Sequence, residues 1–451
     1  MTINIHPSAA DNFNKKADEL YDLVKELPQN AAQQESFPSD LHIAGSIIDG
    51  DIVGDIKVAT SDYQGNTIGR LFNFNGKIYG LDCEGYKRVK SLAERIQSSP
   101  GVRTKLSCSF VEEKLFDWIS NKYKGLEISQ PYMKYLDDEA QAVVKTITSW
   151  IPIANLEVQS LFPISNSQVL PLSKEVMDRW ESKIGSMAGE HKEKVVEHFK
   201  QTRKTYQGLA SVVTVIEAEP EYAFDYTLEE AQKITSILGI FSGATLIPDI
   251  KCVSNIKGSE NIAQAAVFFE SDKGELSSTT TSILDKASAK YWRLSEKDIV
   301  EIRKGGLDKI SSLLAADSLN DFEKHVLNSV FLYSKSAFTA DPVEKVVYML
   351  SSLESILLKN ENEPIQQNLA ERLSVFTAQK LEERKSIIKT IKSVYGVRSK
   401  YLHHGHTSSE LELISDFMKR VWVFFVQLLA NVNRFSSQEE FVSAIDDHKL
   451  G

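Results

Sequence analysis

Residues 341–358 read Asp-Pro-Val-Glu-Lys-Val-Val-Tyr-Met-Leu-Ser-Ser-Leu-Glu-Ser-Ile-Leu-Leu and carry the strongest helix signal of the chain. Asp341 can cap a helix, Pro342 suits its first position, and Glu344 puts a negative charge in its first turn. Apolar residues then recur at intervals of three and four, as on the packed face of a bundle helix: Val343, Val346, Val347, Leu350, Leu353 and Leu357. The stretch therefore predicts a helix of a bundle.

The sequence on both sides continues this helical pattern. Ser295 can cap a helix that begins near Glu296, and Asp321 can cap another that runs through Phe338. Further helices are expected at 369–377, 381–403 and 411–432. Four or five helices with short connections predict a bundle, so we expect an all-helical domain over about residues 320–435.

The amino-terminal part has a different texture, with short apolar runs separated by turn residues between positions 41 and 82. The pair Asn75-Gly76 supplies the positive φ angles that a two-residue hairpin turn requires. Beyond Ser282 no convincing strand is predicted. Helices are expected at 17–27, 86–97, 111–123, 137–150 and 174–206, the last of which two glycines can divide. Strands are expected at 156–161, 212–218 and 264–270.

The length of 451 residues is too great for one ordinary core and predicts two or three domains. The predicted fold class is α+β, with a mixed β and α region followed by an all-α bundle. Residues 1–40 are expected to form a helical arm and a polar linker. Residues 41–280 are expected to form the mixed α/β region, and residues 281–451 the helical bundle.

Composition limits the class of protein. The formal net charge is −10, which disfavours a surface that binds nucleic acid throughout. No apolar stretch approaches the length of a membrane span, and residues 1–10 lack the features of a secretory signal, so we expect a cytoplasmic protein without membrane contact. Cys83, Cys108 and Cys252 lie far apart, so neither a disulfide framework nor a zinc site is predicted.

One segment departs from this acidic balance. From Glu371 to Lys400 there are eight basic and three acidic residues, a local charge of +5. Such a run is typical of a face that binds RNA, but it is also typical of an ordinary solvated helix face. The sequence leaves both interpretations open.

Residues 394–406 read Val-Tyr-Gly-Val-Arg-Ser-Lys-Tyr-Leu-His-His-Gly-His and hold three of the nine histidines. Gly405 would end a helix here in a left-handed cap, and a helix C-terminus favours a cationic imidazole. Cleavage of RNA by its own 2′-hydroxyl requires proton transfer and positive charge near the phosphorane. His403 and Arg398 can supply both without metal, so they are the candidate catalytic pair.

The two side chains do not point the same way on a straight helix. Five residues at 3.6 per turn separate the directions of Arg398 and His403 by roughly 140°. A fray near Gly405, or a second subunit that completes the site, is therefore needed. A metal site at His403, His404 and His406 is a weaker alternative, because no Cys pair or carboxylate lies nearby at ligand spacing.

These residues resemble a known family. The run from Tyr395 to Gly405 resembles the Arg-x4-His signature of HEPN domains, especially the ApeA-like group, whose signature helix carries Tyr, then Arg-Ser, then His near Gly. Residues 349–358 resemble the preceding helix of that group, with its Leu-Glu pair. The likeness covers about the last third of the chain.

The resemblance implies an RNA endonuclease that works as a homodimer without metal or cofactor, its two signature helices facing one another across a shared cleft. It implies that Arg398 contacts the scissile phosphate and that His403 transfers a proton. Many members are toxins or abortive-infection effectors that cleave tRNA or other host RNA, so a role in antiphage defence is expected. Ser399 departs from the family, because active members often carry Asn, Asp or His at that position.

Other residues and regions have supporting roles in this hypothesis. Glu354 can orient Arg398 or a histidine across the bundle, although a glutamate at a helix edge is an equally good interpretation. Ser399, Lys400 and His404 are further candidates for RNA contact. The first 280 or so residues would sense a trigger ligand or protein, or restrain the nuclease. The alternative is a non-catalytic HEPN-fold protein that dimerises or binds a ligand.

Overall fold

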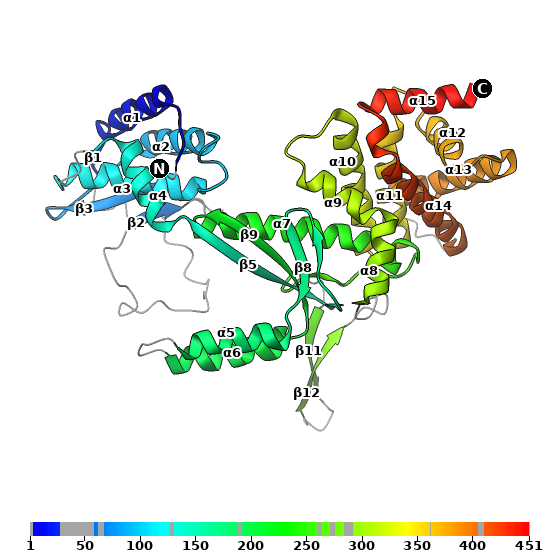
Figure 1. The fold of residues 1–451 in the computed structure, drawn as a ribbon, viewed down its shortest axis with the longest axis horizontal. Coiled ribbons are helices and arrows are strands. Elements are labelled where there is room, and N and C mark those ends of the chain that lie inside the picture. Colours follow the sequence, from blue (N-terminus) through cyan, green and yellow to red (C-terminus); the bar gives the residue numbers. More distant parts are fainter. Residues whose placement is uncertain are drawn as a thin grey trace. The chain divides into compact units, whose positions relative to one another are not determined.

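The computed structural model describes residues 3–27, 58–61, 67–126, 130–186, 192–259, 263–270, 276–283, 292–360, 362–404 and 410–450. The chain forms two compact units, whose elements are labelled in Figure 1. Unit 1 comprises Met1–Ile147 with Val215–Tyr226, and unit 2 comprises Thr148–Thr214 with Thr227–Gly451. The polar linker predicted before residue 40 lies outside the described residues. Within the described ranges, no helix combines the length and apolar composition needed to cross a membrane.

Unit 1 combines a small antiparallel sheet with four helices. The predicted hairpin is confirmed, because Asn75 and Gly76 join two paired strands with φ angles of 50° and 76°. The strands lie in the order β1-β4-β3-β2 and are β1 (Lys25–Glu26), β2 (Val58–Ser61), β3 (Thr67–Phe74) and β4 (Lys77–Gly80). The helices are α1 (Pro7–Tyr21), α2 (Cys83–Gln97), α3 (Cys108–Tyr123) and α4 (Tyr132–Val143).

Side-chain caps begin two of these helices, and one apolar core joins all four. Asp82 accepts a hydrogen bond from the N–H of Gly85 at the start of α2, and Ser107 caps α3 in the same way. The helices bury large side chains against one another, among them Tyr86 and Trp118. Helices α2 and α3 include the predicted ranges 86–97 and 111–123 and begin three residues earlier.

Two predicted helices of unit 1 are misplaced. The helix expected at 17–27 is α1, which begins at Pro7 and ends at Tyr21. The helix expected at 137–150 ends at Val143, and a strand follows it directly. The run Thr146-Ile-Thr148 is β-branched, which disfavours continuation of the helix and favours an extended strand.

Unit 2 contains a five-stranded sheet in the order β10-β5-β9-β8-β7. Its strands are β5 (Lys145–Ala154), β7 (Phe162–Ile164), β8 (Ser167–Pro171), β9 (Ala210–Ala218) and β10 (Asn255–Ile256). Two further pairs are β6 (Leu156–Val158) with β13 (Trp292–Leu294), which run parallel, and β11 (Ala263–Glu270) with β12 (Leu276–Ile283), which run antiparallel. The expectation of no strand beyond Ser282 is wrong because of β13, whose three residues are too short to show a periodic pattern.

The remaining elements of unit 2 are helices. The segment 174–206 is divided as its two glycines predicted, into α5 (Lys174–Gly185) and α6 (Lys192–Tyr206). The others are α7 (Pro220–Ile240), whose residues 220–226 belong to unit 1, and then α8 (Glu296–Ile302), α9 (Asp308–Ala315), α10 (Asp321–Lys335), α11 (Pro342–Leu357), α12 (Ile365–Thr377), α13 (Leu381–His404), α14 (Leu411–Ala430) and α15 (Gln438–Leu450). The sequence-based prediction omits α7 and α15.

Two of the three predicted N-terminal helix caps are confirmed by the structure. Asp341 caps α11, where its Oδ1 accepts from the N–H of Val343 at 2.7 Å, and Ser295 caps α8. The cap predicted at Asp321 is wrong, because Asn320 occupies that position. Asn320 and Glu323 exchange hydrogen bonds in a capping box, so Asp321 becomes the first helical residue.

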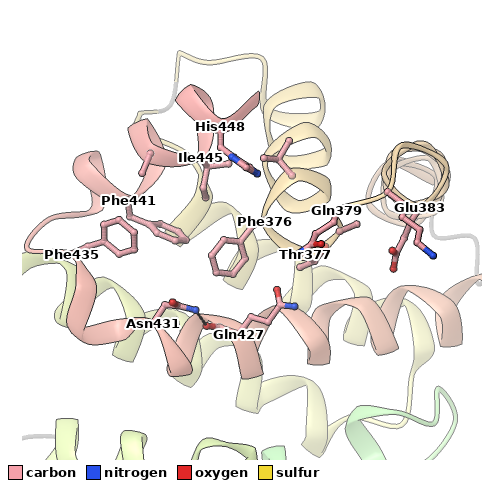
Figure 2. A pocket seen from close by; sticks show the side chains of 14 residues that line it. Phe376, Thr377, Gln379, Glu383, Gln427, Asn431, Phe435, Phe441, Ile445 and His448 are labelled. Carbon is pink, nitrogen blue, oxygen red and sulfur yellow. Dashed lines mark hydrogen bonds between the residues drawn. The ribbon is translucent and has the colours of Figure 1, made fainter. Parts of the chain in front are cut away.

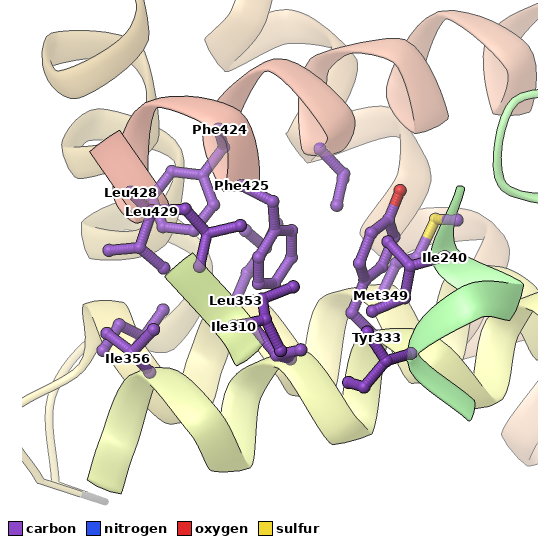
Figure 3. Close-up of a cluster of buried hydrophobic side chains, with 14 of the residues drawn as sticks. Ile240, Ile310, Tyr333, Met349, Leu353, Ile356, Phe424, Phe425, Leu428 and Leu429 are labelled. Carbon is purple, nitrogen blue, oxygen red and sulfur yellow. The ribbon is translucent and has the colours of Figure 1, made fainter. Parts of the chain in front are cut away.

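The sheet and the bundle of unit 2 share one apolar core. Figure 3 shows Ile240, at the end of α7, beside Tyr333 and Met349 of the bundle. The same buried cluster extends from Ile153 in the sheet to Leu429 in α14. The domain boundary predicted near residue 280 therefore does not coincide with an edge of unit 2, because burial of this common core joins both sides of it.

Candidate functional site

The candidate site is built on two neighbouring helices, α11 and α13. The capped start and the apolar stripe of α11 fix this helix in the core, with Leu353 and Ile356 completely buried. Glu354 lies between them in sequence and keeps 20% of its side chain exposed, on the side of α11 that meets α13. A carboxylate is thereby held at the edge of the core.

Glu354 pairs with Arg398 across the two helices. Its Oε1 accepts a hydrogen bond from Arg398 Nη1 at 2.7 Å and another from the hydroxyl of Tyr395, also at 2.7 Å. Tyr395 and Arg398 are one turn apart on α13, so both reach the same oxygen. The structure shows the predicted contact of Glu354 with Arg398, and the same glutamate is also partly exposed at the edge of its helix.

Tyr395 is a member of this cluster that the sequence analysis did not assign to the site. Burial raises the pKa of its hydroxyl, and the negative charge of Glu354 raises it further. The hydroxyl is therefore protonated at neutral pH and acts as a donor. The three-residue spacing to Arg398 was the available signal, but a tyrosine in a bundle helix more often packs in the core.

The guanidinium of Arg398 is constrained but not fully satisfied. Three quarters of its side chain is buried, and its Nε is buried without a hydrogen-bond partner among the described residues. The Arg398 Cζ lies 5.8 Å from the centre of the Tyr395 ring, which adds a weak cation–π contact. A buried donor without a partner costs about 1–3 kcal/mol, so the position is not optimised for stability alone.

His403 is exposed near the end of α13. The helix continues through His404, so no fray separates His403 from Arg398, and their directions differ by roughly 140°. The structure therefore does not bring the two predicted catalytic residues to one face of α13. The side chain of His404 and the residues Gly405 and His406 lie outside the described part of the chain.

Exposed residues form a continuous stripe along α13, which we call the α13 stripe. Its members recur at intervals of four and three and are Lys385, Lys389, Lys392, Gly396, Ser399 and His403. Lys400 is exposed beside it. A Cβ added at Gly396 would meet nothing within 4 Å, so no packing within the described structure explains this glycine. The stripe combines positive charge, small residues and a histidine.

Two arginines of the basic run between Glu371 and Lys400 contact other parts of the bundle and are not exposed. Arg372 is buried and pairs with Glu363 and Asp446, so it holds the bundle together instead of facing solvent. Arg384 donates from Nε to the carbonyl of Ala378 at 2.9 Å. The exposed positive charge is therefore concentrated in the lysines of α13.

The described residues contain no group of three or more His, Cys, Asp and Glu side chains arranged to hold a metal ion. The three cysteines are free thiols, of which Cys83 is exposed and Cys252 buried.

Comparisons of the chain with protein-family models, curated proteins and solved structures found no match.

Proposed function

We propose that this protein is a metal-independent endoribonuclease of the HEPN type. The observation that carries the proposal is the position of Arg398. Its guanidinium donates a hydrogen bond to Glu354, which Tyr395 also contacts, and lies 5.8 Å from the centre of the Tyr395 ring. Arg398 belongs to the same helix as His403 and the exposed lysines. Two orienting contacts on a partly accessible cation are what electrostatic stabilisation of a transition state requires.

The proposed reaction uses the RNA as its own nucleophile. The 2′-oxygen forms a bond to the adjacent phosphorus, the bond from phosphorus to the 5′-oxygen breaks, and the products are a 2′,3′-cyclic phosphate and a 5′-hydroxyl. Arg398 neutralises charge on the phosphorane, and His403 transfers a proton to or from one of the two oxygens. Ser399 and Lys400 are exposed beside Arg398 and are available to contact the RNA backbone.

A second copy of the chain completes the site in this proposal. Along one straight helix, Arg398 and His403 point in directions that a single phosphate cannot satisfy. A dimer in which the α13 helices approach each other near their carboxy-terminal ends would place the Arg398 of one copy near the His403 of the other. Gly396 and Ser399 are small enough for such a close approach, and the lysines would extend the RNA surface on either side.

The biological setting follows from the same resemblance. The proposed enzyme is a cytoplasmic, toxin-like effector of antiphage defence that cleaves tRNA or another RNA. Unit 1 and the sheet of unit 2 would sense the trigger ligand or protein and hold the nuclease inactive until it arrives.

The test is incubation of the purified full-length protein with total tRNA in EDTA, followed by analysis of the fragment ends. Wild type should leave 2′,3′-cyclic phosphates, and His403→Ala should not. The matched control is His198→Ala, which removes another exposed helical histidine and should cleave like wild type.

The ion pair itself favours one alternative, a non-catalytic bundle that dimerises or binds a ligand. A cation that pairs with Glu354 inside its own chain can serve structure alone. This alternative is preferred if wild type does not cleave tRNA and if expression in cells leaves growth and RNA unchanged with or without His403→Ala.

A further inference from the structure

A cavity of about 690 Å³ lies within unit 2, away from the candidate nuclease site. It is bounded by the end of α12, the start of α13, the end of α14 and the helix α15 (Figure 2). Lys380, on its rim, is 18 residues before Arg398, which corresponds to roughly 25 Å along a helix axis. The cavity therefore takes no part in the proposed cleavage site.

Three phenylalanines form one side of the cavity. Figure 2 shows Phe376, Phe435 and Phe441 gathered together. The ring centres of Phe376 and Phe441 are 5.3 Å apart, and those of Phe435 and Phe441 are 5.2 Å apart, both in edge-on contact. Phe441 is completely buried, whereas Phe376 and Phe435 keep part of their rings accessible and can contact a further planar ring.

Two amides at the carboxy-terminal end of α14 face the same space, Gln427 within the helix and Asn431 directly after it. Gln427 and Asn431 are one turn apart, and Figure 2 shows both on the cavity side of the helix. Asn431 Nδ2 donates to the backbone carbonyl of Gln427 at 2.7 Å, which fixes the amide and leaves its Oδ1 as an acceptor. A planar ligand with both donors and acceptors on its edge would match this pair of amides.

Charged side chains stand at the rim. Lys380 directly precedes α13, Glu383 lies in its first turn, and His448 comes from α15. Within the described structure Lys380 has no ion-pair partner, whereas Lys385, five residues further on, pairs with Glu382 at 3.0 Å. Lys380 is thus a cation on the rim of the cavity that forms no ion pair among the described residues, and Glu383 places a carboxylate on the same rim.

We propose that this cavity binds a mononucleotide. The base lies against the rings of Phe376 and Phe435 and is hydrogen-bonded by Gln427 and Asn431. The phosphate pairs with Lys380. Ligand pockets commonly have volumes of about 300–1,000 Å³, so the size fits a ligand of this class. The inference stands independently of the nuclease proposal, because it uses none of the residues assigned to RNA cleavage.

The experiment is calorimetric titration of the full-length protein with AMP, GMP, CMP and UMP, and with the four corresponding nucleosides. At least one nucleotide should bind, and more tightly than its nucleoside. Gln427→Leu should weaken binding about tenfold or more, because a hydrogen bond to the base is lost while the volume is kept. Lys380→Gln should weaken binding of the nucleotide but not of the nucleoside.

The matched control is Gln367→Leu, which makes the same change at an exposed position in the first turn of α12, outside the cavity. This variant should bind the nucleotide as wild type does.

The proposal is overturned if none of the eight compounds binds at millimolar concentration, or if Gln427→Leu and Lys380→Gln leave binding unchanged. It is also overturned if unstructured RNA displaces the nucleotide from this cavity, which would assign the cavity to an RNA base. If Gln427→Leu does not fold, Lys380→Gln still tests the proposal, because Lys380 is exposed and its replacement should leave the fold intact.

Discussion

Glu354 Oε1 lies 2.7 Å from Arg398 Nη1 and accepts a hydrogen bond from the hydroxyl of Tyr395, also at 2.7 Å. One carboxylate oxygen therefore receives two donors from successive turns of α13. The contact ties α11 to α13 and limits the directions that the guanidinium can adopt. Glu354 acts on catalysis, in the proposed enzyme, only through Arg398 and is a positioning residue.

Replacement of Glu354 by Gln should lower kcat for tRNA cleavage about ten- to a hundredfold, because the charged hydrogen bond that orients Arg398 is lost. The Michaelis constant should change little, because the lysines proposed to bind RNA are untouched. We expect the free energy of unfolding to fall by only about 1 kcal/mol, since the pair is partly exposed.

Glu371→Gln is the control for that variant. Glu371 is 24% exposed against 20% for Glu354, and it pairs with Lys449 away from Arg398. The Glu371→Gln variant should lose a similar free energy of unfolding and keep the kcat of wild type. Equal losses of kcat in the two variants would assign Glu354 a purely structural role.

A mixture of inactive variants should recover activity if the site is shared between two copies. Arg398→Ala and His403→Ala would each be inactive as homodimers. A mixed dimer would have one site with both native residues, so an equal, randomly assorted mixture should show roughly a quarter of wild-type activity. Cleavage assays after co-refolding or co-expression measure this directly. No recovery, in mixed dimers verified by mass spectrometry, would mean that Arg398 and His403 of one chain act together.

Neutralising the α13 stripe should weaken RNA binding in a salt-dependent way. Lys389→Gln combined with Lys392→Gln removes two exposed cations that can contact phosphates. The slope of log affinity against log salt concentration should become shallower by about one to two. The control is Lys324→Gln with Lys419→Gln, at exposed positions of α10 and α14. An unchanged slope in the stripe variant would identify this basic run as an ordinary solvated face.

The sequence predicted the helices of the bundle well because their signals are local. Asp341 caps α11 as predicted, and the apolar spacing that follows it corresponds to a buried face. The boundary between α4 and β5 was missed although Thr146-Ile-Thr148 is β-branched, because three residues are a weak local signal and the pairing of β5 in the sheet joins residues far apart in sequence. The common core of sheet and bundle is equally invisible to local patterns, since it joins residues far apart in sequence.

The candidate site was predictable in its residue types but not in its geometry. The sequence identified Arg398, His403 and Glu354, and the structure brings Arg398 and Glu354 into contact. The role of Tyr395 depends on how α13 is rotated against α11, which the spacing of residues on one helix does not define. The angular separation of Arg398 and His403 followed from helix geometry alone, and the continuous α13 agrees with it.

Lys345 carries the last prediction, which concerns stability. The helical pattern gives it no special role, yet the side chain is completely buried. Its Nζ donates to the backbone carbonyls of Ala244 and Ile250, the latter at 2.6 Å. Burial lowers its pKa from 10.5 to about 8, an effect that the nearby Cys252 and Asp249 oppose.

Lys345→Met should destabilise the protein at neutral pH by about 1–3 kcal/mol, because buried carbonyls lose their donor. Between pH 8 and 10.5 the unfolded chain keeps a proton that folded Lys345 has released, so this group adds stability as pH rises. The stability of wild type relative to Lys345→Met should therefore increase from about pH 8 towards about pH 10. Tyrosines with raised pKa values contribute equally to the stability of both proteins, so their contribution cancels in the difference between wild type and Lys345→Met.

Urea denaturation across this pH range measures the effect. The control is Lys335→Met, an exposed substitution in α10, whose stability should lie within about 0.5 kcal/mol of wild type. A difference between wild type and Lys345→Met that does not vary with pH would mean that Lys345 keeps its charge in the folded protein.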